Sequence, residues 1–562
     1  MVSFLALGAR CFYLQFYRNQ HYSEACLGQR QSYRNLQPQR GVILDCRGRV
    51  LAASNKVQTI FAEPRAIQDV KATSSELAPI VDMGAHIICQ MILESRNPGF
   101  TRIKTTTDHD QCSASTKIYG IGVQSDWQRH YPMRSLAANV VGFTSLDNRG
   151  LEGIELKYDK ELSGSAARNI FFADVKRRPI RAKQQDGVLT NGKGIILTID
   201  ATIQQFTRDV LIKQYENYEA ESAVAIVAEP KTGAILAMVS LPDFDPADIR
   251  TTDPNNFRSR AITDWYEPGS IIKPVAVVIA LEAGVVNKTE KIFCENGSYS
   301  GKGFGRIGEY RRGFGDLTVQ EILINSSNIG MAKIGQRLGK DRLYDGLKLF
   351  GFGRKTGIEL PGEVDGLLRP ADTWTGYSVT RIPFGQEICV TSMQLVRAFC
   401  ILANGGRLVR PFMVRAIVDN EGNITELKRP PPPVGYIVKP EVAKWIVTEA
   451  MASVVNEGTG KRAKLDKWQV FGKTGTANIA RSDSRGYSDS DYVASFVAGA
   501  PVADPAIVVL VSIRKPNRSL GKGYTGGAVA APVAAKIIEK TLTYLGVKPD
   551  QNPGIYVQGR NP

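Results

Sequence analysis

Histidine is scarce in this chain of 562 residues, and most of the chain has none. The four histidines all precede residue 131, and the last of them is His130. The long remainder therefore contains neither a Ser-His-Asp triad nor a histidine metal site of its own. If that part of the chain is a hydrolase or an acyltransferase, its general base is not histidine.

The eight cysteines follow no metal or redox pattern. They form no C-x-x-C pair, and their positions do not match the spacing of zinc ligands. The sequence therefore indicates neither a metal site nor a disulfide framework.

Acidic residues are outnumbered by basic ones, 55 to 71, which leaves a formal net charge of +16. Such an excess indicates an anionic partner, which can be nucleic acid, a membrane surface or an acidic polymer. The sequence has no nucleic-acid-binding motif and no concentrated Lys/Arg tract, so we do not expect nucleic acid. A chain of this length is expected to form two or more domains.

No apolar run near the N-terminus is long enough to cross a bilayer. The opening stretch, MVSFLALGARCFYLQFYRNQ, is interrupted by Arg10 and has no basic segment before it. A spanning helix needs about 20 predominantly apolar residues. Residues 1–17 are either a buried structural helix or the outer end of a signal anchor that starts upstream. We favour a partial membrane anchor, because aromatic residues followed by Arg18 suit a membrane interface.

The polar, glycine-rich segment 181–194 divides the remaining chain. Before it, residues 18–190 mix short apolar strands with helical stretches and form an N-terminal domain. After it, residues 195–546 begin and end with strand-like segments and are helical between them. We therefore expect an α/β domain whose central sheet is assembled from both ends of the segment. Residues 547–562 form a tail that we expect to be disordered.

A serine and a lysine three residues apart occur in YEPGSIIKP, where Ser270 precedes Lys273 and a long apolar segment follows. A helix starting near Ser270 would place both side chains on one face. Burial would lower the pKa of the lysine towards that of a usable base, and a serine beside such a lysine is an activated nucleophile. The same spacing recurs at 512–515 and 519–522, where a polar run favours a solvated loop.

Two further short motifs are, like Ser-x-x-Lys, too common to identify a function by themselves. Ser326-x-Asn328 begins an apolar helical run, where a serine most often caps the helix. Lys-Thr-Gly occurs at 231, 355 and 473, but only Lys473-Thr-Gly475 lies in a strand-like apolar segment. There the glycine leaves room for a ligand backbone, while the lysine and threonine present a cation and a hydroxyl to a carboxylate.

The order of the three motifs distinguishes them from chance matches. Ser-x-x-Lys, Ser-x-Asn and Lys-Thr-Gly in this order are the series of the serine penicillin-recognising enzymes. The surrounding segments YEPGSIIKP, SSNIGMAKIG, TRIPFGQEICVTSMQL, GKTGTA and YTGGAVAAPV resemble a class B penicillin-binding protein, most like the cell-division peptidoglycan transpeptidase. RGVILDCRGRVLAAS and GLEGIELKYDKELSG resemble the N-terminal pedestal of that family, so the resemblance spans roughly residues 8–545.

The resemblance implies a penicillin-binding transpeptidase fold of the α/β (α+β) class. Its central, mainly antiparallel sheet would be flanked by helices and preceded by an extended, mixed pedestal domain. It also implies roles for the residues of all three motifs: the catalytic residues would be Ser270, Lys273, Ser326 and Asn328, and the substrate-binding residues would be Lys473, Thr474, Gly475 and Thr476.

In the implied mechanism, Lys273 takes the proton of Ser270 as its Oγ attacks the D-Ala-D-Ala carbonyl of a stem peptide. Ser326 relays the proton to the leaving D-Ala, and Asn328 orients Lys273 and the substrate amide. The N–H groups of Ser270 and Thr476 form the oxyanion hole. Burial and the nearby positive charge of the Lys-Thr-Gly lysine would keep Lys273 neutral.

In the same mechanism Lys473, Thr474 and Thr476 hold the terminal carboxylate, and Gly475 lets the substrate lie along the strand. An amine from a second stem peptide then resolves the acyl-enzyme and forms a cross-link. No metal or cofactor is required.

The resemblance further implies a bacterial inner-membrane protein with a single-pass anchor and its catalytic domain in the periplasm. Its partners would be peptidoglycan stem peptides, β-lactams, a SEDS-type glycan polymerase and other membrane proteins of the division machinery. The sequence leaves open a D,D-carboxypeptidase, an elongation-type transpeptidase, a β-lactamase or penicillin sensor, and a non-catalytic scaffold.

Four positions depart from the usual pattern of the family. Cys46 occupies a position where the family usually has arginine. Arg134 and Asn139 replace a usual glycine and histidine, and Glu229 replaces a usual aspartate. We expect these departures to affect packing between domains or contacts with partners, because all catalytic positions match.

Overall fold

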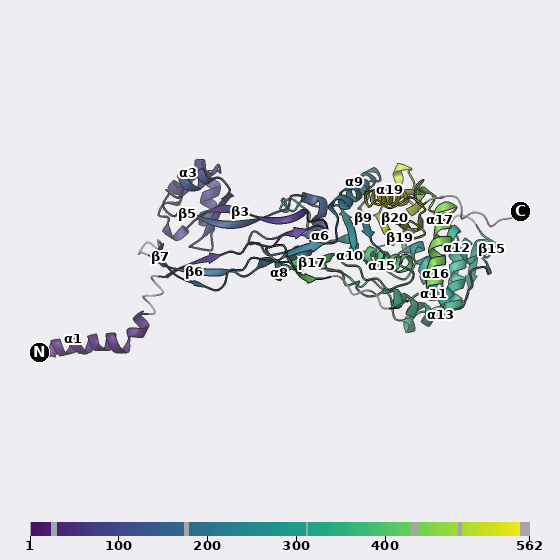
Figure 1. Cartoon of the computed structure of the whole chain (residues 1–562), viewed down its shortest axis with the longest axis horizontal. Coiled ribbons are helices and arrows are strands. Elements are labelled where there is room, and N and C mark those ends of the chain that lie inside the picture. The colour runs from purple at the N-terminus through teal and green to yellow at the C-terminus, as the bar shows by residue number, and fades with distance from the viewer. Residues whose placement is uncertain are drawn as a thin grey trace.

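The computed structural model describes residues 2–23, 31–173, 179–310, 313–428, 435–481 and 486–550. Over these residues the molecule is elongated, with helix α1 (Val2–Phe12) at one end and a large mixed domain at the other (Figure 1). The expected tail falls mostly outside the described residues, which end at 550. Its first residues are held in place, because the carbonyl of Lys548 accepts a hydrogen bond from the Trp468 indole.

Within the described ranges, a five-stranded antiparallel sheet forms the centre of the large domain, with the strand order β10-β9-β21-β20-β19. The hairpin β9 (Ser222–Ala228) and β10 (Ile235–Leu241) comes from the start of the domain. The other strands come from its end: β19 (Phe471–Ala480), β20 (Tyr487–Ala500) and β21 (Ile507–Arg514). The prediction that the sheet is assembled from both ends is confirmed.

The sheet is buried on both faces, and the sequence of β9 shows why. All seven of its residues are buried. Ala223, Ala225 and Val227 belong to one hydrophobic cluster, whereas Val224, Ile226 and Ala228 belong to another. Because successive strand residues point to opposite faces, a continuous apolar run serves two cores at once.

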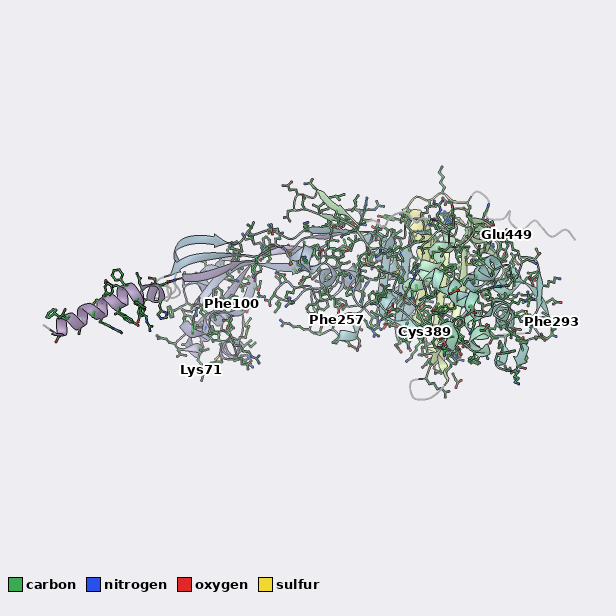
Figure 2. The ribbon with its side chains drawn as sticks, turned by 90° about the horizontal axis from the view of Figure 1, so that it is seen from below. Lys71, Phe100, Phe257, Phe293, Cys389 and Glu449 are labelled. Carbon is green, nitrogen blue, oxygen red and sulfur yellow. The ribbon has the colours of Figure 1, made fainter. Side chains whose placement is uncertain are left out.

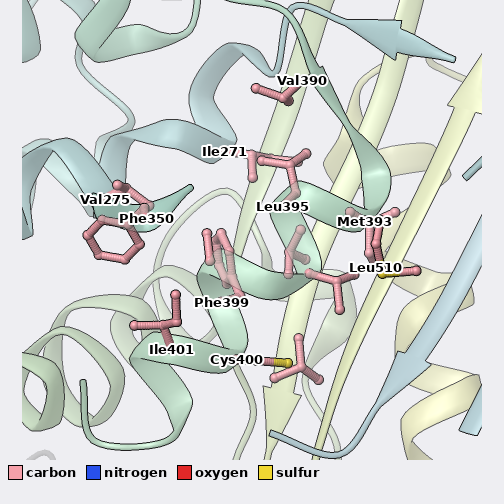
Figure 3. Close-up of a cluster of buried hydrophobic side chains, with 14 of the residues drawn as sticks. Ile271, Val275, Phe350, Val390, Met393, Leu395, Phe399, Cys400, Ile401 and Leu510 are labelled. Atoms are coloured by element: carbon pink, nitrogen blue, oxygen red, sulfur yellow. The ribbon is translucent and has the colours of Figure 1, made fainter. Parts of the chain in front are cut away.

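Helices cover the two faces. Helices α9 (Ala201–Asn217) and α19 (Ala531–Tyr544) pack together on one face, and α15 (Ser392–Ala403) packs on the other. Figure 3 shows the hydrophobic core on the α15 side of the sheet. There Phe399 and Leu395 of α15 lie in one cluster with Leu510 of β21 and with Ile271 and Val275 of the segment around Lys273.

Beyond α15 lies a helical lobe that carries two of the three motifs. It contains α11 (Lys273–Glu282), α12 (Val319–Asn325) and α13 (Asn328–Phe350), the last with a break at Gly339, together with α16 (Pro440–Trp445) and α17 (Ala452–Asn456). The first eight residues of α11 are buried, so the helix is surrounded on nearly every side as the sequence predicts.

The N-terminal domain is built around a second sheet. In the described part of the chain it has seven strands, which include β2 (Ile43–Leu44), β3 (Val50–Ala62), β4 (Thr101–Thr106) and β5 (Ile121–His130). Three of its strands lie later in the sequence: β8 (Gly194–Leu197), β17 (Val414–Val418) and β18 (Ile424–Leu427). The two domains therefore share a sheet and are joined by more than a single linker.

Helices α3 (Val70–Val81) and α4 (Ala85–Leu93) cover β3 and β4 with a separate small core at the end of the molecule that is nearer to α1. Figure 2 shows Lys71 and Phe100 in this lobe, and Phe293 at the opposite end of the molecule. A further sheet, β1 (Gln31–Leu36), β6 (Ala167–Ala173) and β7 (Pro179–Asp186), lies between α1 and the domain body.

Among the residues that the structure describes, none of the helices has the length and apolar character that crossing a membrane requires. Helix α1 exposes its apolar side chains, among them Phe4 and Leu5. The expectation of a partial anchor at 1–17 stays a prediction.

Candidate active site

Ser270 lies in a tight 3-10 turn, Gly269–Ile272, that leads directly into α11. The N–H of Gly269 donates a hydrogen bond of 3.1 Å to the carbonyl of Gly385. Gly385 has a positive φ of 89°, and a Cβ there would lie 2.1 Å from the Gly269 oxygen. A glycine is therefore required at 385, where the backbone supports the serine turn from behind.

Lys273 is the first residue of α11 and is completely buried. Its Nζ contacts the Ser326 carbonyl at 2.6 Å, the Ser326 Oγ at 3.2 Å and the Asn328 Oδ1 at 2.8 Å. Burial lowers the pKa of Lys273 to about 7, and the negative charge of Glu309 opposes this change. The lysine is therefore tuned to a range in which it can act as a base.

No hydrogen bond joins Ser270 Oγ to Lys273 Nζ among the described residues, although the two residues are one turn apart in the same segment. Catalytic hydrogen bonds are often long or misaligned before substrate binds. Transfer of the Ser270 proton thus requires the two side chains to come within hydrogen-bond distance.

Ser326 and Asn328 lie on either side of the junction between α12 and α13. Ser326 ends α12 in the left-handed conformation, with φ 57° and ψ 41°. The helix cap expected of this motif is provided by Ser327, whose Oγ accepts a hydrogen bond from the N–H of Gly330. The left-handed residue turns both the carbonyl and the hydroxyl of Ser326 towards Lys273.

Lys473 approaches the same hydroxyl from the sheet. It is fully buried in β19, and its Nζ donates to Ser326 Oγ at 3.0 Å. Burial lowers the pKa of Lys473 well below its usual range, and the neighbouring Lys273 lowers it further. Two ammonium groups on one hydroxyl would repel each other, so at least one of the two amines is neutral.

A neutral Lys273 satisfies all of its contacts. The Ser326 carbonyl and the Asn328 Oδ1 accept only, and a neutral amine has two N–H groups to donate to them. Its lone pair then accepts the hydroxyl hydrogen of Ser326, whose oxygen accepts from Lys473. The three side chains form one hydrogen-bonded chain through which a proton can pass.

Thr474 and Thr476 extend the site along β19, the edge strand of the sheet. The Thr474 hydroxyl hydrogen-bonds the Thr459 hydroxyl at 2.7 Å, and the Thr476 Oγ1 accepts from the N–H of Gly526 at 3.1 Å. Both threonines line the cleft. An unpaired edge strand with hydroxyls beside it is suited to an extended peptide that ends in a carboxylate.

Gly475 is a glycine for a reason that the sequence did not reveal. A Cβ at this position would lie 2.8 Å from Ile271 Cγ1 and 2.9 Å from the carbonyl oxygen of Pro268. The missing side chain thus faces the turn that carries Ser270. The glycine lets the serine turn pack directly on β19, which places Ser270 beside Thr476.

The motifs meet in a cleft of about 630 Å³. Its lining includes Ser270, Ser326, Asn328, Thr474 and Thr476. Lys273 and Lys473 lie buried beneath, and Gly475 faces the serine turn. The seven candidate residues of the three sequence motifs and the adjacent Thr476 therefore gather around one cleft.

The alternative motif matches are separate from this cleft. Ser512 is buried in β21 and hydrogen-bonds Ser495, while Lys515 pairs with Glu221 at the surface. Ser519 is exposed in a short turn, and Lys231 of the hairpin pairs with Asp504 in solvent. The preference for Ser270 over the other serines is consistent with this placement.

The sequence patterns did not indicate two acidic residues that the structure places in the cleft. Glu309 binds the start of α13, and Glu267 joins two loops to the serine turn. The Glu267 Oε1 accepts from the N–H of Glu387 at 2.9 Å and from the Tyr487 hydroxyl at 3.0 Å, and burial raises the pKa of Glu267. Glu267 could be noticed by its place three residues before Ser270, but no local signal marks Glu309.

Three of the four departures from the family pattern lie where the two domains meet. The thiol of Cys46 donates to Asp200 at 3.8 Å, and the amide of Asn139 donates to the carbonyl of Asn256 at 2.9 Å. Arg134 also pairs across the junction, with an aspartate of the larger domain. The expectation that these departures affect packing between domains fits their positions.

A serine above a buried lysine, set between an antiparallel sheet and a helical lobe, defines an acyl-transferring enzyme fold that works without histidine. Residues 223–539 match the family described as the penicillin binding protein transpeptidase domain, and residues 35–197 match the penicillin-binding protein dimerisation domain. The chain belongs to the penicillin-binding protein transpeptidase family.

Curated relatives cover nearly the whole chain. Stage V sporulation protein D of Bacillus subtilis is 34% identical, over 98% of this chain and 85% of the relative. Peptidoglycan D,D-transpeptidase FtsI of Escherichia coli is 30% identical, over 91% of this chain and 84% of the relative. The resemblance to class B penicillin-binding proteins is thereby confirmed.

The fold is also found in solved structures. A peptidoglycan synthetase from Bifidobacterium adolescentis superposes with a TM-score of 0.74 at 25% identity, covering 93% of this chain and 98% of that one. The predicted fold, a transpeptidase domain with an antiparallel sheet behind an N-terminal pedestal, is confirmed.

Proposed function

We propose that the protein is a serine D,D-transpeptidase that cross-links peptidoglycan stem peptides through an acyl-enzyme at Ser270. The observation that carries this proposal is the buried Lys273, whose lowered pKa and contacts with Ser326 and Asn328 replace the absent histidine. The names of the relatives support the same substrate.

In the first step the Ser270 Oγ attacks the carbonyl carbon of the D-Ala-D-Ala bond, and its proton passes to the lone pair of Lys273. The resulting oxyanion accepts hydrogen bonds from the N–H groups of Ser270 and Thr476. The close packing of the serine turn on β19 supports this pairing, since a Cβ on Gly269 would lie 3.3 Å from the Thr476 oxygen.

In the second step the C–N bond breaks and the leaving D-Ala amine takes a proton. Lys273 gives its proton to the Ser326 oxygen as the Ser326 hydroxyl hydrogen goes to the amine. The 3.2 Å contact between Lys273 and Ser326 supports this relay. An amine from a second stem peptide then attacks the ester carbonyl. A C–N bond replaces the C–O bond to Ser270, which forms the cross-link, and the proton lost by the amine returns to the Ser270 Oγ.

The terminal carboxylate of the donor peptide binds to Lys473, Thr474 and Thr476. An arriving carboxylate adds an opposite charge beside Lys473, which favours its ammonium form and offsets the cost of burial. Lys273 then stays neutral as the base. Binding of the correct substrate thus sets the charges of the two lysines.

The proposal is tested by mass spectrometry of the intact protein after incubation with a labelled penicillin, followed by peptide mapping. We expect one adduct, on Ser270. An adduct on Ser512 or Ser519, or none on the folded protein, contradicts the assignment. Incubation with a stem peptide and an amine acceptor then separates transpeptidation from hydrolysis, because a D,D-carboxypeptidase would release only D-Ala.

The finer assignment is a single-pass inner-membrane protein at the division septum, with its catalytic domain in the periplasm. The exposed apolar side chains of α1 and the similarity to FtsI support it. The partners would be a SEDS-type glycan polymerase and other division proteins of the membrane. Loss of septal localisation when α1 is deleted, with acylation of Ser270 retained, is the expected result.

A further inference from the structure

The start of α13 is capped by a carboxylate from a distant loop. Glu309 follows strand β14 (Gly305–Gly308) and is half-buried in the cleft. Its Oε2 accepts from the N–H of Asn328 at 2.8 Å, and its Oε1 accepts from the N–H of Ile329 at 3.2 Å. The Oε1 also accepts from the Ser327 hydroxyl at 2.5 Å.

These contacts complete the cap of the helix. The first N–H groups of a helix have no partner within it, and a negative charge there is favourable. Glu309 takes the first two, and Ser327 takes that of Gly330. The helix that carries Asn328 is therefore held in place by a residue outside the three motifs.

The same carboxylate acts on the base. Asn328 and Ser326 lie directly on either side of Ser327, and both bind the Nζ of Lys273. Glu309 is the charged group whose effect on the pKa of Lys273 is resolved, and it favours the ammonium form. Lys273 in turn lowers the pKa of Lys473, so the two buried amines disfavour each other's positive charge.

We propose that Glu309 is a positioning residue of the transpeptidation site, which holds Asn328 in contact with Lys273 and balances the charge of the two buried lysines. This inference rests on the proposed function. Without Glu309 the start of α13 loses the acceptor for two N–H groups, and Lys273 loses the one negative charge that acts on it from the described residues.

The test is the pH dependence of penicillin acylation in the full chain, for the wild-type protein and for Glu309→Gln and Glu309→Asp. Acylation needs neutral Lys273, so the wild-type rate falls as the pH drops through about 7. In Glu309→Gln the ammonium form of Lys273 loses the nearby negative charge, so the pKa of Lys273 falls. The acid limb, which is the part of the pH–rate profile where the rate drops with falling pH, then moves to lower pH. The rate on the alkaline plateau also falls, by about tenfold, because glutamine keeps only one acceptor oxygen and no charge, which weakens the cap.

Glu309→Asp separates charge from reach. It keeps the negative charge but is one methylene shorter, so we expect the plateau rate to fall while the acid limb stays near its wild-type position. A purely structural role would lower the rate in both variants without moving the limb in either.

Glu363→Gln is the matched control. Glu363 is buried, and like Glu309 it accepts from two successive N–H groups, those of Thr356 and Gly357, and from a hydroxyl, that of Thr356, outside the cleft lining. We expect this variant to keep the wild-type acid limb, which shows that loss of a buried cap does not shift it by itself.

The outcomes are distinct. If wild-type protein is acylated and the acid limb of Glu309→Gln coincides with that of wild type or of Glu363→Gln, the inference about Glu309 is wrong and the proposed function stands. If folded wild-type protein is not acylated at Ser270, the proposed function itself fails. Melting temperatures identify variants that do not fold. If Glu309→Gln does not fold, Glu309→Asp decides. The inference is overturned if the acid limb of Glu309→Asp moves to lower pH although the negative charge is retained.

Discussion

Lys273 is the residue whose chemistry depends most on its surroundings. As an exposed side chain it would be an ammonium at neutral pH, with no lone pair to accept a proton. Burial at the start of α11 lowers its pKa to about 7, and three polar contacts hold its amine in place. A lysine can then replace histidine as a general base.

Replacing Lys273 with arginine tests whether charge or basicity matters. A guanidinium keeps the positive charge but does not give up its proton at accessible pH. We expect Lys273→Arg to abolish acylation by penicillin, measured by mass spectrometry of protein whose folding is checked by circular dichroism. Acylation at the wild-type rate would mean that another group activates Ser270.

The pH profile of the wild-type enzyme reports on the same group. Since the pKa of Lys273 is lowered to about 7, the fraction of neutral base and the second-order acylation rate should rise tenfold per pH unit below that value and level off above it. The measurement is stopped-flow or gel-based acylation between pH 5 and pH 9. A flat profile down to pH 5 would contradict a lysine base with this pKa.

Thr476 allows backbone and side-chain contributions to be separated. Thr476→Ala removes only the hydroxyl, so acylation should fall by about ten- to thirtyfold, or about 1 to 2 kcal/mol. Thr476→Pro also deletes the N–H and should cost about a hundredfold or more. If folded Thr476→Pro is acylated as fast as Thr476→Ala, the oxyanion hole lies elsewhere.

Lys473→Ala removes the charge that is proposed to hold the substrate carboxylate. This variant should weaken substrate binding and lower the acylation rate together.

At the scale of elements, the site depends on how one turn packs on one strand. The turn Gly269–Ile272 rests on β19 because Gly475 has no side chain, and Gly385 supports the turn from its other side. The left-handed residue between α12 and α13 then brings Ser326 to the same point. Three elements from distant parts of the chain thus meet at the nucleophile.

Gly475→Ala tests this packing. The added Cβ would lie 2.8 Å from Ile271, which forces the serine turn away from β19. We expect a loss of about 1 to 3 kcal/mol in stability and a marked loss of acylation, measured by thermal unfolding and by labelled penicillin. Gly315→Ala is the control, since its nearest neighbour would be at an ordinary 3.8 Å. Equal behaviour of the two variants would exclude the close packing proposed here.

At the scale of the whole molecule, the catalytic domain and the pedestal are joined by shared structure. Strands β8 and β17 continue the pedestal sheet, and Asp200 at the start of α9 pairs with Arg47 and Arg49 of the pedestal. In these pairs the Asp200 carboxylate is buried while the arginines are partly exposed, and the pairs add to the common sheet in joining the two domains.

The pedestal contains a buried ion-pair cluster that makes its stability testable. The carboxylate of Glu155 binds Arg40 and Arg129, each at 2.6 Å, and all three side chains are nearly inaccessible. Glu155→Ala removes the carboxylate that pairs with Arg129 and leaves the buried Arg40 with Asp159 alone, so it should cost about 3 to 5 kcal/mol. The measurement is urea unfolding followed by circular dichroism.

The exposed pair of Lys231 with Asp504 provides the control, since Lys231→Ala should cost less than about 1 kcal/mol. Acylation of Ser270 in folded Glu155→Ala should stay at the wild-type rate, because the cluster lies outside the catalytic cleft. A similar stability loss in both variants would show that the buried cluster has no special role.

The sequence alone determined those secondary-structure elements and those catalytic pairs that depend on residues close together in the chain. Continuous apolar runs predicted the strands of the central sheet, because a strand buried on both faces needs no polar alternation. Ser270 and Lys273 were found as a pair because three residues in a helical turn define their separation without any other part of the chain. The order of the three motifs then identified the family.

Only the tertiary structure decided what depends on residues far apart in the chain. Lys473 and Glu309 reach Ser326 and Asn328 through folding alone, and the pKa of Lys273 follows from the burial that these elements create together. The reason for Gly475 and the sharing of the pedestal sheet with β17 were equally hidden. A local pattern fixes only neighbours a few positions away, whereas contacts and desolvation depend on which distant segments fill the space around a side chain.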